Sequence, residues 1–395
     1  MELRSQIEAR GSTYRFGGTY APEYQGVVDA FLENFRVEDE IGAACSIMLD
    51  GRTVVDIFGG WRDGAKSKPW DAPTTVCMMS VAKGISATAM AMVFDRGLID
   101  LYAPVARYWP EFAQAGKADI TVCQALSHLA GVPVADSARE GDIYDFDAMA
   151  RALAAQAPLW PPGTTQVYHS ATLGHIVGML VKKLTRKSLG RFIREEISGP
   201  LGADYQIGLT AEEEARCATM IPSPNNLVNA AKRAAPDSVA FRSWQSLPAS
   251  EDFNSHLWRS SEIPSVNGHG TARGVARIYA ALSLGGTLDG VTLGRPSSFQ
   301  ELTREQLSAA RSLDSDVHER VAMAYRLNSP PHRPTGPNMS SFGHSGAGGA
   351  QSFADPEAQV GYCYGCNKMH DGRDIGPRAG SLIDATYRAI SGAET

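Results

Sequence analysis

The stretch VCMMSVAKGISATAMAMVFDRG, residues 76–97, is typical of a buried helix that carries a reactive motif at its start. Apolar side chains dominate from Ser80 to Asp95, and Arg96 followed by Gly97 is typical of a helix end. Ser80 and Lys83 form an S-x-x-K in the expected first turn. Because three residues are nearly one helical turn, the hydroxyl and the amine lie on the same face.

This S-x-x-K has two interpretations. A serine hydroxyl becomes an effective nucleophile when a neighbouring base takes its proton, and a desolvated lysine has a lowered pKa that suits this task. The amide N–H groups at a helix start can also stabilise an oxyanion. Alone, the motif is more typical of a helix cap beside a solvent-facing lysine. The surrounding residues are almost uncharged, which predicts that Lys83 is partly buried, and a buried lysine requires a reason.

Outside this helix, local patterns predict strands near both ends of the chain. Residues 43–58 read as two strands joined by the hairpin dipeptide Asp50-Gly51. Residues 351–354 and Val360–Cys366 read as two more strands, followed by a closing helix over 378–391. We therefore expect one sheet built from both termini, with a helical insertion between them.

The inserted region gives two further expectations. Apolar residues at helical spacing predict one buried stripe, made of Leu173, Ile176, Val177, Leu180 and Leu184. The stretch 222–265 is rich in Pro, Asn and Ser, holds Trp244 and Trp258, and has weak periodicity. This composition predicts long loops of the kind that form the walls of a site.

Two later segments complete a set of three motifs. Tyr168-His169-Ser170 directly precedes the second helix, and Gly343-His344-Ser345-Gly346 precedes a strand. With Ser80 and Lys83 they follow the order S-x-x-K, Y-x-[NS] and [KH]-[TS]-G. The sequence thus resembles the serine beta-lactamase-like superfamily, which includes class C beta-lactamases, D-Ala-D-Ala carboxypeptidases and family VIII carboxylesterases. The resemblance covers most of residues 25–391, and the run HSGAGGAQSFADP looks most like the esterase branch.

The resemblance implies an α/β (α+β) fold of two lobes. An antiparallel sheet flanked by helices would combine residues 1–75 with 266–395, and a mostly helical lobe would span 76–265. The active-site cleft would lie between them, where ligand sites are common.

The resemblance also implies roles for individual residues. Ser80 would be the acylated nucleophile, and Lys83 with Tyr168 would shuttle its proton. Which of the two is the formal base stays open, because a coupled pair titrates as a unit. We expect the nearby ammonium to lower the pKa of Tyr168.

The remaining site residues surround these three. Ser170 would orient Lys83, and His344, Ser345 and Gly346 would edge the cleft. The backbone amides of Ser80 and Ala347 would form the oxyanion hole. Trp160, upstream of Tyr168, is the tryptophan expected nearest the site, whereas His128 and His169 are expected to be structural.

These assignments predict a serine hydrolase that cleaves small-molecule carboxylic esters through an acyl-serine. The alternatives are a beta-lactamase, D-amino-acid peptidase, amidase or acyltransferase of the same superfamily, and a catalytically silent penicillin-binding-like protein. A silent relative is expected to have lost Ser80, Lys83 or Tyr168, and all three are present. His344 stands where many beta-lactamases have lysine, and a histidine of pKa about 6.5 is mostly neutral at pH 7. We therefore expect uncharged short to medium esters to be preferred over cephalosporins.

Composition excludes other classes of function. In 395 residues, 43 acidic and 37 basic side chains leave a charge of −6 with no basic stripe, so we expect no nucleic-acid partner. No 18-residue apolar run predicts a membrane span, and the first residues lack the apolar region of a signal peptide, so we expect a cytoplasmic protein. The sequence leaves the oligomeric state open.

Other motifs carry no chemistry. The histidines lack metal-ligand spacing, and Cys363 and Cys366 would point to opposite faces of one strand, so we expect neither a metal nor another cofactor. Residues 343–347 nearly match the G-x-S-x-G nucleophile elbow, but the fifth residue is alanine and no helix is expected to follow. Ser80, rather than Ser345, is therefore the predicted nucleophile.

Overall fold

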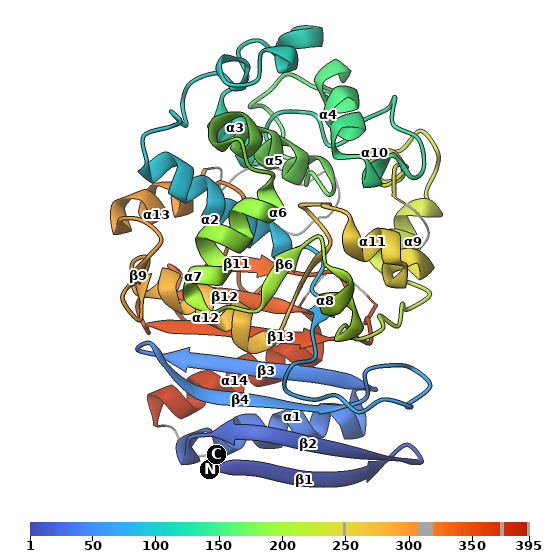
Figure 1. Cartoon of the computed structure of the whole chain (residues 1–395), viewed down its shortest axis with the longest axis vertical. Coiled ribbons are helices and arrows are strands. Elements are labelled where there is room, and N and C mark those ends of the chain that lie inside the picture. The colour runs from blue at the N-terminus through green and yellow to red at the C-terminus, as the bar shows by residue number, and fades with distance from the viewer. Residues whose placement is uncertain (248–249, 307–318, 372–374, 393–395) are drawn as a thin grey trace.

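An eight-stranded antiparallel sheet spans the lower half of the molecule (Figure 1). The computed structural model describes residues 1–247, 250–306, 319–371 and 375–392. The strand order is β1-β2-β4-β3-β13-β12-β11-β10. The strands are β1 (Glu2–Ala9), β2 (Ser12–Tyr20), β3 (Gly42–Leu49), β4 (Arg52–Gly60), β10 (Arg326–Leu327), β11 (Phe342–Ser345), β12 (Gln351–Asp355) and β13 (Val360–Cys366).

The two ends of the chain meet in the middle of this sheet, as predicted. Strand β13 pairs with β3, and Tyr364 lies opposite Cys45. The predicted hairpin joins β3 to β4, and Asp50 and Gly51 have φ values of 48° and 73°. Both residues are left-handed, which is the requirement of a type I′ turn.

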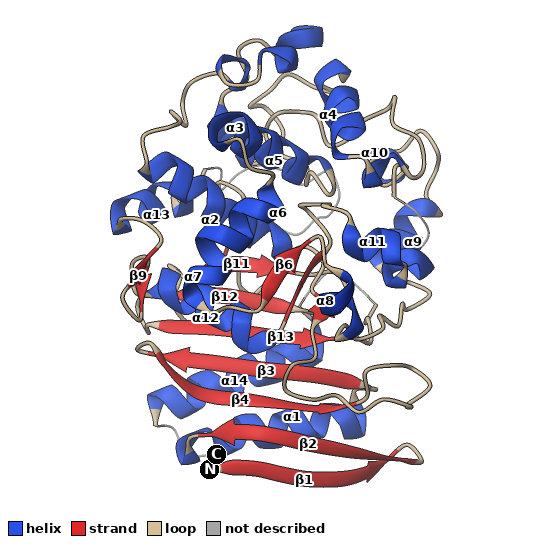
Figure 2. Ribbon diagram, in the orientation of Figure 1, coloured by secondary structure: helices blue, strands red, loops and turns tan. Residues whose placement is uncertain are grey.

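Helices cover both faces of the sheet (Figure 2). Helices α1 (Gln25–Val37) and α14 (Gly376–Ser391) pack together on one face, where Phe31 and Phe35 are buried. Helix α12 (Ala272–Ser283) packs on the other face, against β13 and β3.

The lone C-x-x-C lies on β13. Cys363 belongs to the core on the α12 side, and Cys366 belongs to the core under α1 and α14. The two thiols therefore point to opposite faces, as the strand period predicts. Both are buried and free.

The upper half of the molecule is mostly helical, with α2 (Val81–Asp95) at its centre. Every residue of α2 from Val81 to Val93 is buried, because α5 (Thr172–Thr185), α13 (Pro296–Thr303) and β11 all pack against it. The expected stripe on α5 is confirmed from Leu173 to Leu180, and Leu184 is half-buried at its end.

Shorter elements complete the structure. The helices are α3 (Val122–Leu126), α4 (Phe146–Ala155), α6 (Leu189–Phe192), α7 (Gly199–Leu201), α8 (Ala211–Ala215), α9 (Leu227–Lys232), α10 (Val239–Arg242) and α11 (His256–Ser260). The short strands are β5 (Val76–Cys77), β6 (Tyr205–Ile207) and β7 (Gly268–Gly270), which form a second sheet in the order β5-β7-β6, and the pair β8 (Thr287–Leu288) and β9 (Val291–Thr292).

The prediction of long loops over 222–265 is wrong for much of that stretch. Asn226, Ser238 and Ser255 each cap a short helix with the side chain, so residues that suggested loops are helix N-caps. Trp244 and Trp258 belong to the core. Residues 248–249 lie outside the described residues.

The mixed α/β architecture with an antiparallel sheet is confirmed. The division into lobes at 75/76 and 265/266 stays an interpretation. The small sheet joins residues from both sides of the second boundary, because β7 pairs with β5 and β6.

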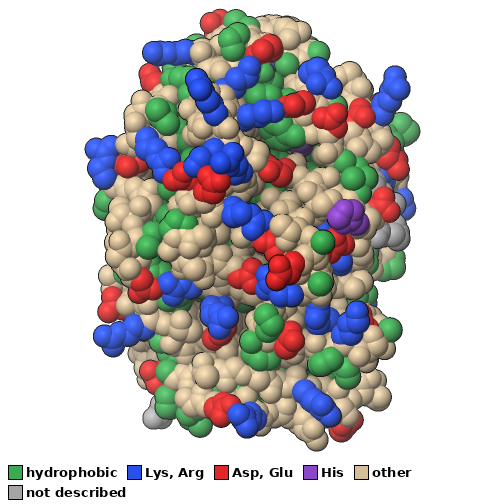
Figure 3. All heavy atoms as spheres, in the orientation of Figure 1, with side chains coloured by type: hydrophobic (Ala, Val, Ile, Leu, Met, Phe, Trp, Pro, Cys, Tyr) green, Lys and Arg blue, Asp and Glu red, His purple; other side chains and the backbone are tan. Residues whose placement is uncertain are grey.

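On the face seen in Figure 3, Lys and Arg side chains are interspersed with Asp and Glu. Among the described residues, none of the helices has both the length and the apolarity needed to cross a bilayer.

Candidate active site

The chain enters α2 through a strained turn. Met79 has a φ of 48°, a conformation that costs free energy in a residue with a side chain and persists only where the surroundings fix it. Met78 on one side donates its N–H to the Gly268 carbonyl at 2.8 Å. The turn places Ser80 at the N-cap of α2, where 7% of its surface is exposed. Ser80 is therefore held at a fixed point on the helix N-terminus.

Lys83 is fully buried beneath Ser80. Its Nζ lies 3.2 Å from Ser80 Oγ, 2.7 Å from the Ser170 carbonyl and 3.0 Å from the Ser265 carbonyl. Burial, reinforced by the charge of Arg326, holds the pKa of Lys83 well below its usual value of 10.5. A neutral amine has two N–H donors and one lone pair. In the neutral form the two carbonyls take both donors, and the lone pair is left for the Ser80 hydroxyl proton.

Tyr168 lies next to both Ser80 and Lys83. Its hydroxyl hydrogen-bonds Ser80, and Lys83 Nζ lies 4.8 Å from the centre of its ring. The expectation that a neighbouring cation lowers the pKa of Tyr168 is wrong in its net direction. Burial raises this pKa above 10.0 by more than Arg326 and the Ser80 hydrogen bond lower it. Tyr168 is therefore a phenol at neutral pH and does not accept the Ser80 proton, so the neutral form of Lys83 is the base available to Ser80.

His344 closes the site from β11. Its Nδ1 lies 2.7 Å from the Ser345 carbonyl, which can only accept, so Nδ1 carries the proton. Nε2 is then free to accept from the Tyr168 hydroxyl at 3.4 Å. Burial, with the charge of Arg326, holds the pKa of His344 well below 6.5. The surroundings of His344 therefore favour the neutral state that was expected from the sequence.

The loop after β11 lies against the turn that precedes Ser80. A Cβ on Gly346 would come within 2.1 Å of the Met78 carbonyl oxygen, so only glycine permits this approach. Gly346 donates its N–H to the Ala350 carbonyl at 2.7 Å, and the next residue, Ala347, is half-buried. Within the described residues, neither the Ser80 nor the Ala347 amide donates a hydrogen bond. Both amides are thus available to an oxyanion.

Two arginines at this edge were missed by the sequence reasoning. Arg326 on β10 lies 4.8 Å from the centre of the Tyr168 ring, and its Nη1 is 3.3 Å from Ser345 Oγ. Arg333 Nη1 is 3.2 Å from the same oxygen. Glu319 pairs with both guanidinium groups, at 3.3 and 2.6 Å. Two cations and one carboxylate leave a net positive charge beside Ser345. Isolated arginines in an irregular stretch gave no signal for this cluster.

The other predicted residues surround the reacting groups. Ser170 contacts Lys83 through its backbone carbonyl. Trp160 is half-buried and donates its indole N–H to the Thr165 carbonyl at 3.0 Å, so its place near the site stays a prediction. The His128 ring lies 4.9 Å from that of Tyr168, and its Nδ1 accepts the His169 amide N–H at 3.0 Å. Both histidines therefore support the Tyr168 segment.

Comparisons with known proteins find similarity over most of the chain. Residues 28–385 match the family described as Beta-lactamase. The chain is 34% identical over 371 residues to the Esterase/beta-lactamase LipL of Mycobacterium tuberculosis, covering 90% of this chain and 83% of that protein.

Solved structures are similar over nearly the whole chain. A family VIII carboxylesterase matches with 39% identity and a TM-score of 0.87, covering 95% of this chain and 99% of its own. A penicillin-binding protein homologue from Caulobacter crescentus matches with 34% identity and a TM-score of 0.86, with the same coverage.

Proposed function

Because the chain belongs to the Beta-lactamase family, and to its esterase branch, we propose that its serine carboxylesterase activity proceeds through an acyl-enzyme on Ser80. One observation carries this assignment. Lys83 is buried, has two of its hydrogen-bonding positions taken by carbonyls, and lies 3.2 Å from Ser80 Oγ. A neutral amine in this position is a base aimed at one hydroxyl.

Acylation begins when Ser80 Oγ attacks the ester carbonyl and Lys83 Nζ takes the hydroxyl proton. The developing oxyanion is stabilised by the amides of Ser80 and Ala347. The Tyr168 hydroxyl then donates its proton to the departing alcohol oxygen. The Lys83 ammonium and the Arg326 guanidinium each lie 4.8 Å from the centre of the resulting phenolate ring. Two nearby cations stabilise this transient negative charge.

Deacylation reverses the proton movements. Water attacks the acyl-serine and gives a proton to the Tyr168 phenolate. When the second tetrahedral intermediate collapses, the Lys83 ammonium returns its proton to Ser80 Oγ. The products are one acid and one alcohol, and both residues recover their starting protonation states. This scheme makes Lys83 the base in acylation and Tyr168 the acid, which the sequence alone left open.

Uncharged esters of short to medium acyl chain are the proposed preferred substrates, because the neutral His344 supplies no charge for a carboxylate. A beta-lactam is the second candidate, and a specific observation favours it. Arg326 and Arg333 both contact Ser345 Oγ, so a substrate carboxylate at this edge would meet cations from β10 and its following loop.

A substrate panel distinguishes these two candidates. We would measure kcat/KM at about pH 7.5 for p-nitrophenyl butyrate, nitrocefin and a D-amino-acid amide, with the wild-type chain and with Arg333→Gln. The proposal expects the ester to be the best substrate and expects Arg333→Gln to reduce only nitrocefin turnover. A preference for nitrocefin or for the amide would contradict the ester assignment.

A further inference from the structure

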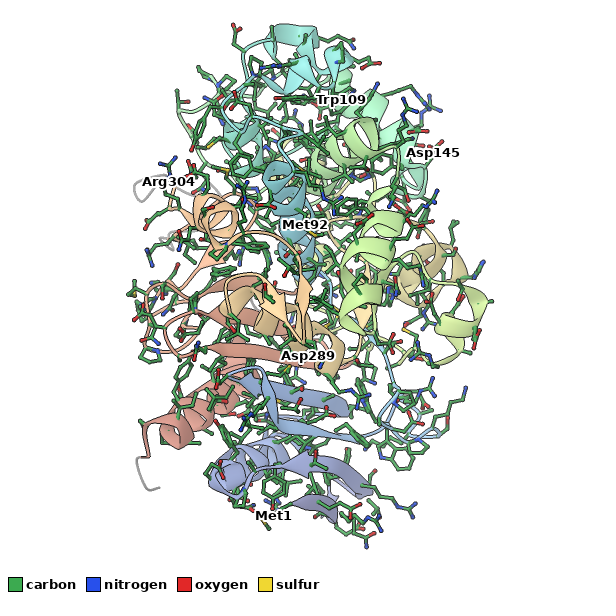
Figure 4. The ribbon with its side chains drawn as sticks, turned by 60° about the vertical axis from the view of Figure 1, so that its left-hand side comes forward. Met1, Met92, Trp109, Asp145, Asp289 and Arg304 are labelled. Atoms are coloured by element: carbon green, nitrogen blue, oxygen red, sulfur yellow. The ribbon has the colours of Figure 1, made fainter. Side chains whose placement is uncertain are left out.

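Strand β1 forms a free edge of the main sheet. Among the described residues, β1 pairs with β2 on one side and with no strand on the other. Figure 4 shows this edge, marked by Met1, at one end of the molecule, whereas α2, which carries Met92, lies nearer the middle. An interaction here would leave the active site uncovered.

The backbone groups that face the free edge belong to alternate residues. Met1 and Tyr20 exchange hydrogen bonds, with Tyr20 N–H donating to the Met1 carbonyl at 3.0 Å. In an antiparallel pair, inward- and outward-facing residues alternate along the strand. The N–H and C=O groups of Glu2, Arg4, Gln6 and Glu8 therefore point outward.

The side chains of these residues share one face of the sheet. Glu2, Arg4, Gln6 and Glu8 are exposed, whereas Leu3 is buried and Ile7 half-buried on the α1 side. A second strand added to this edge would thus find a row of polar side chains on one face and a partly open apolar row on the other.

We propose that β1 pairs antiparallel with β1 of a second copy of this chain, about a two-fold axis at Gln6. In this register Arg4 lies opposite Glu8 of the partner and Glu8 lies opposite Arg4, so the charges match twice. Cross-strand pairs of opposite charge stabilise a sheet, and like charges destabilise it. Two-fold pairing of identical edges also closes the assembly as a dimer.

Neighbouring registers place like charges opposite each other. Moving the axis by one residue toward the N-terminus sets Glu2 against Glu8. Moving it one residue the other way sets Arg4 against Arg10. A slip of one residue in either direction is therefore unfavourable, and the Gln6-centred register is the one that pairs the whole of ELRSQIEAR with its own copy.

Charged side chains on an edge strand can instead serve to keep other strands away. A row of one sign achieves this most simply, because any two copies then repel. The mixed row on β1 does not repel its own copy in the Gln6-centred register. On the opposite face the half-buried Ile7 would lie opposite Ser5 of the partner, and the exposed part of its side chain would gain cover.

Charge exchange tests the proposal. Sedimentation velocity over about 1 to about 100 µM would compare the wild-type chain with Arg4→Glu, Glu8→Arg and the double variant Arg4→Glu/Glu8→Arg. Each single variant places like charges opposite each other, so we expect its dimer to dissociate at least tenfold more readily. The double variant restores both pairs and should dimerise as the wild type does.

Arg15→Glu is the matched control, because Arg15 is an exposed arginine on β2, opposite Gln6 and one strand in from the edge. It should leave the dimer intact, and ester hydrolysis should be unchanged in all variants, which confirms folding. A wild type that stays monomeric, single variants that dimerise normally, or a double variant that fails to recover would each overturn the proposal.

Discussion

Replacing Lys83 with methionine removes the proposed base while keeping a long side chain in its buried site. General bases contribute about 10²- to 10⁴-fold, and a nucleophile and base that act as a unit contribute more. We expect kcat for p-nitrophenyl butyrate to fall about 10⁴-fold, which corresponds to about 5 kcal/mol of lost transition-state stabilisation. KM should change little, because Lys83 lies fully buried below Ser80 and does not reach the substrate.

The same substitution has a predictable cost in stability. The carbonyls of Ser170 and Ser265 lose their donor, and a buried group left without its hydrogen bond costs about 1–3 kcal/mol. Equilibrium denaturation at matched buffer and temperature measures this loss and identifies the conditions under which the variant stays folded. Ser345→Ala is the control, because it removes a hydroxyl at the cleft edge, and its kcat should fall less than tenfold. A folded Lys83→Met enzyme within tenfold of wild-type kcat would refute the role of Lys83.

Three further predictions follow from the same contacts. Tyr168→Phe should nearly abolish turnover, and the double variant with Lys83→Met should be little worse than either single variant; fully additive losses would show that the two groups act independently. Because the reactive form of Lys83 is the neutral amine, kcat/KM should rise as the pH increases from neutral through the lowered pKa of Lys83. It should fall only above pH 10.0, where the raised pKa of Tyr168 allows the phenol to ionise, and a rate that decreases from pH 7 to pH 9 would contradict this order. His344→Lys should raise the ratio of nitrocefin to p-nitrophenyl butyrate kcat/KM by about tenfold, since a permanent cation would then face the substrate carboxylate; an unchanged ratio would remove the electrostatic reason for the ester preference.

Local signals made the main elements predictable. The apolar run from Ser80 to Asp95, the Asp50-Gly51 turn and the strand Val360–Cys366 each specify their structure within a few neighbouring residues. Strands β1 and β2 were not predicted, because their charged and glycine-containing sequence becomes a pair of strands only through β4 and the covering helix α1.

The candidate site was predictable where motifs bring residues together along the chain. Ser80 and Lys83 are one turn apart on one helix, so their contact follows from spacing. Two other contacts come from distant segments that carry no motif. They are the Ser265 carbonyl, which accepts a hydrogen bond from Lys83, and the Arg326 guanidinium, which lies against the Tyr168 ring. Burial also decides the direction of the Tyr168 pKa, and burial depends on tertiary packing that the sequence does not display.

The identity of the acylated residue tests the central claim most directly. The wild-type chain would be treated with a fluorophosphonate, its intact mass measured, and the labelled peptide sequenced by tandem mass spectrometry. The account predicts one adduct per chain on Ser80, and no adduct on Ser80→Ala under the same conditions. An adduct on Ser345, or stoichiometric labelling of a folded Ser80→Ala variant, would contradict it.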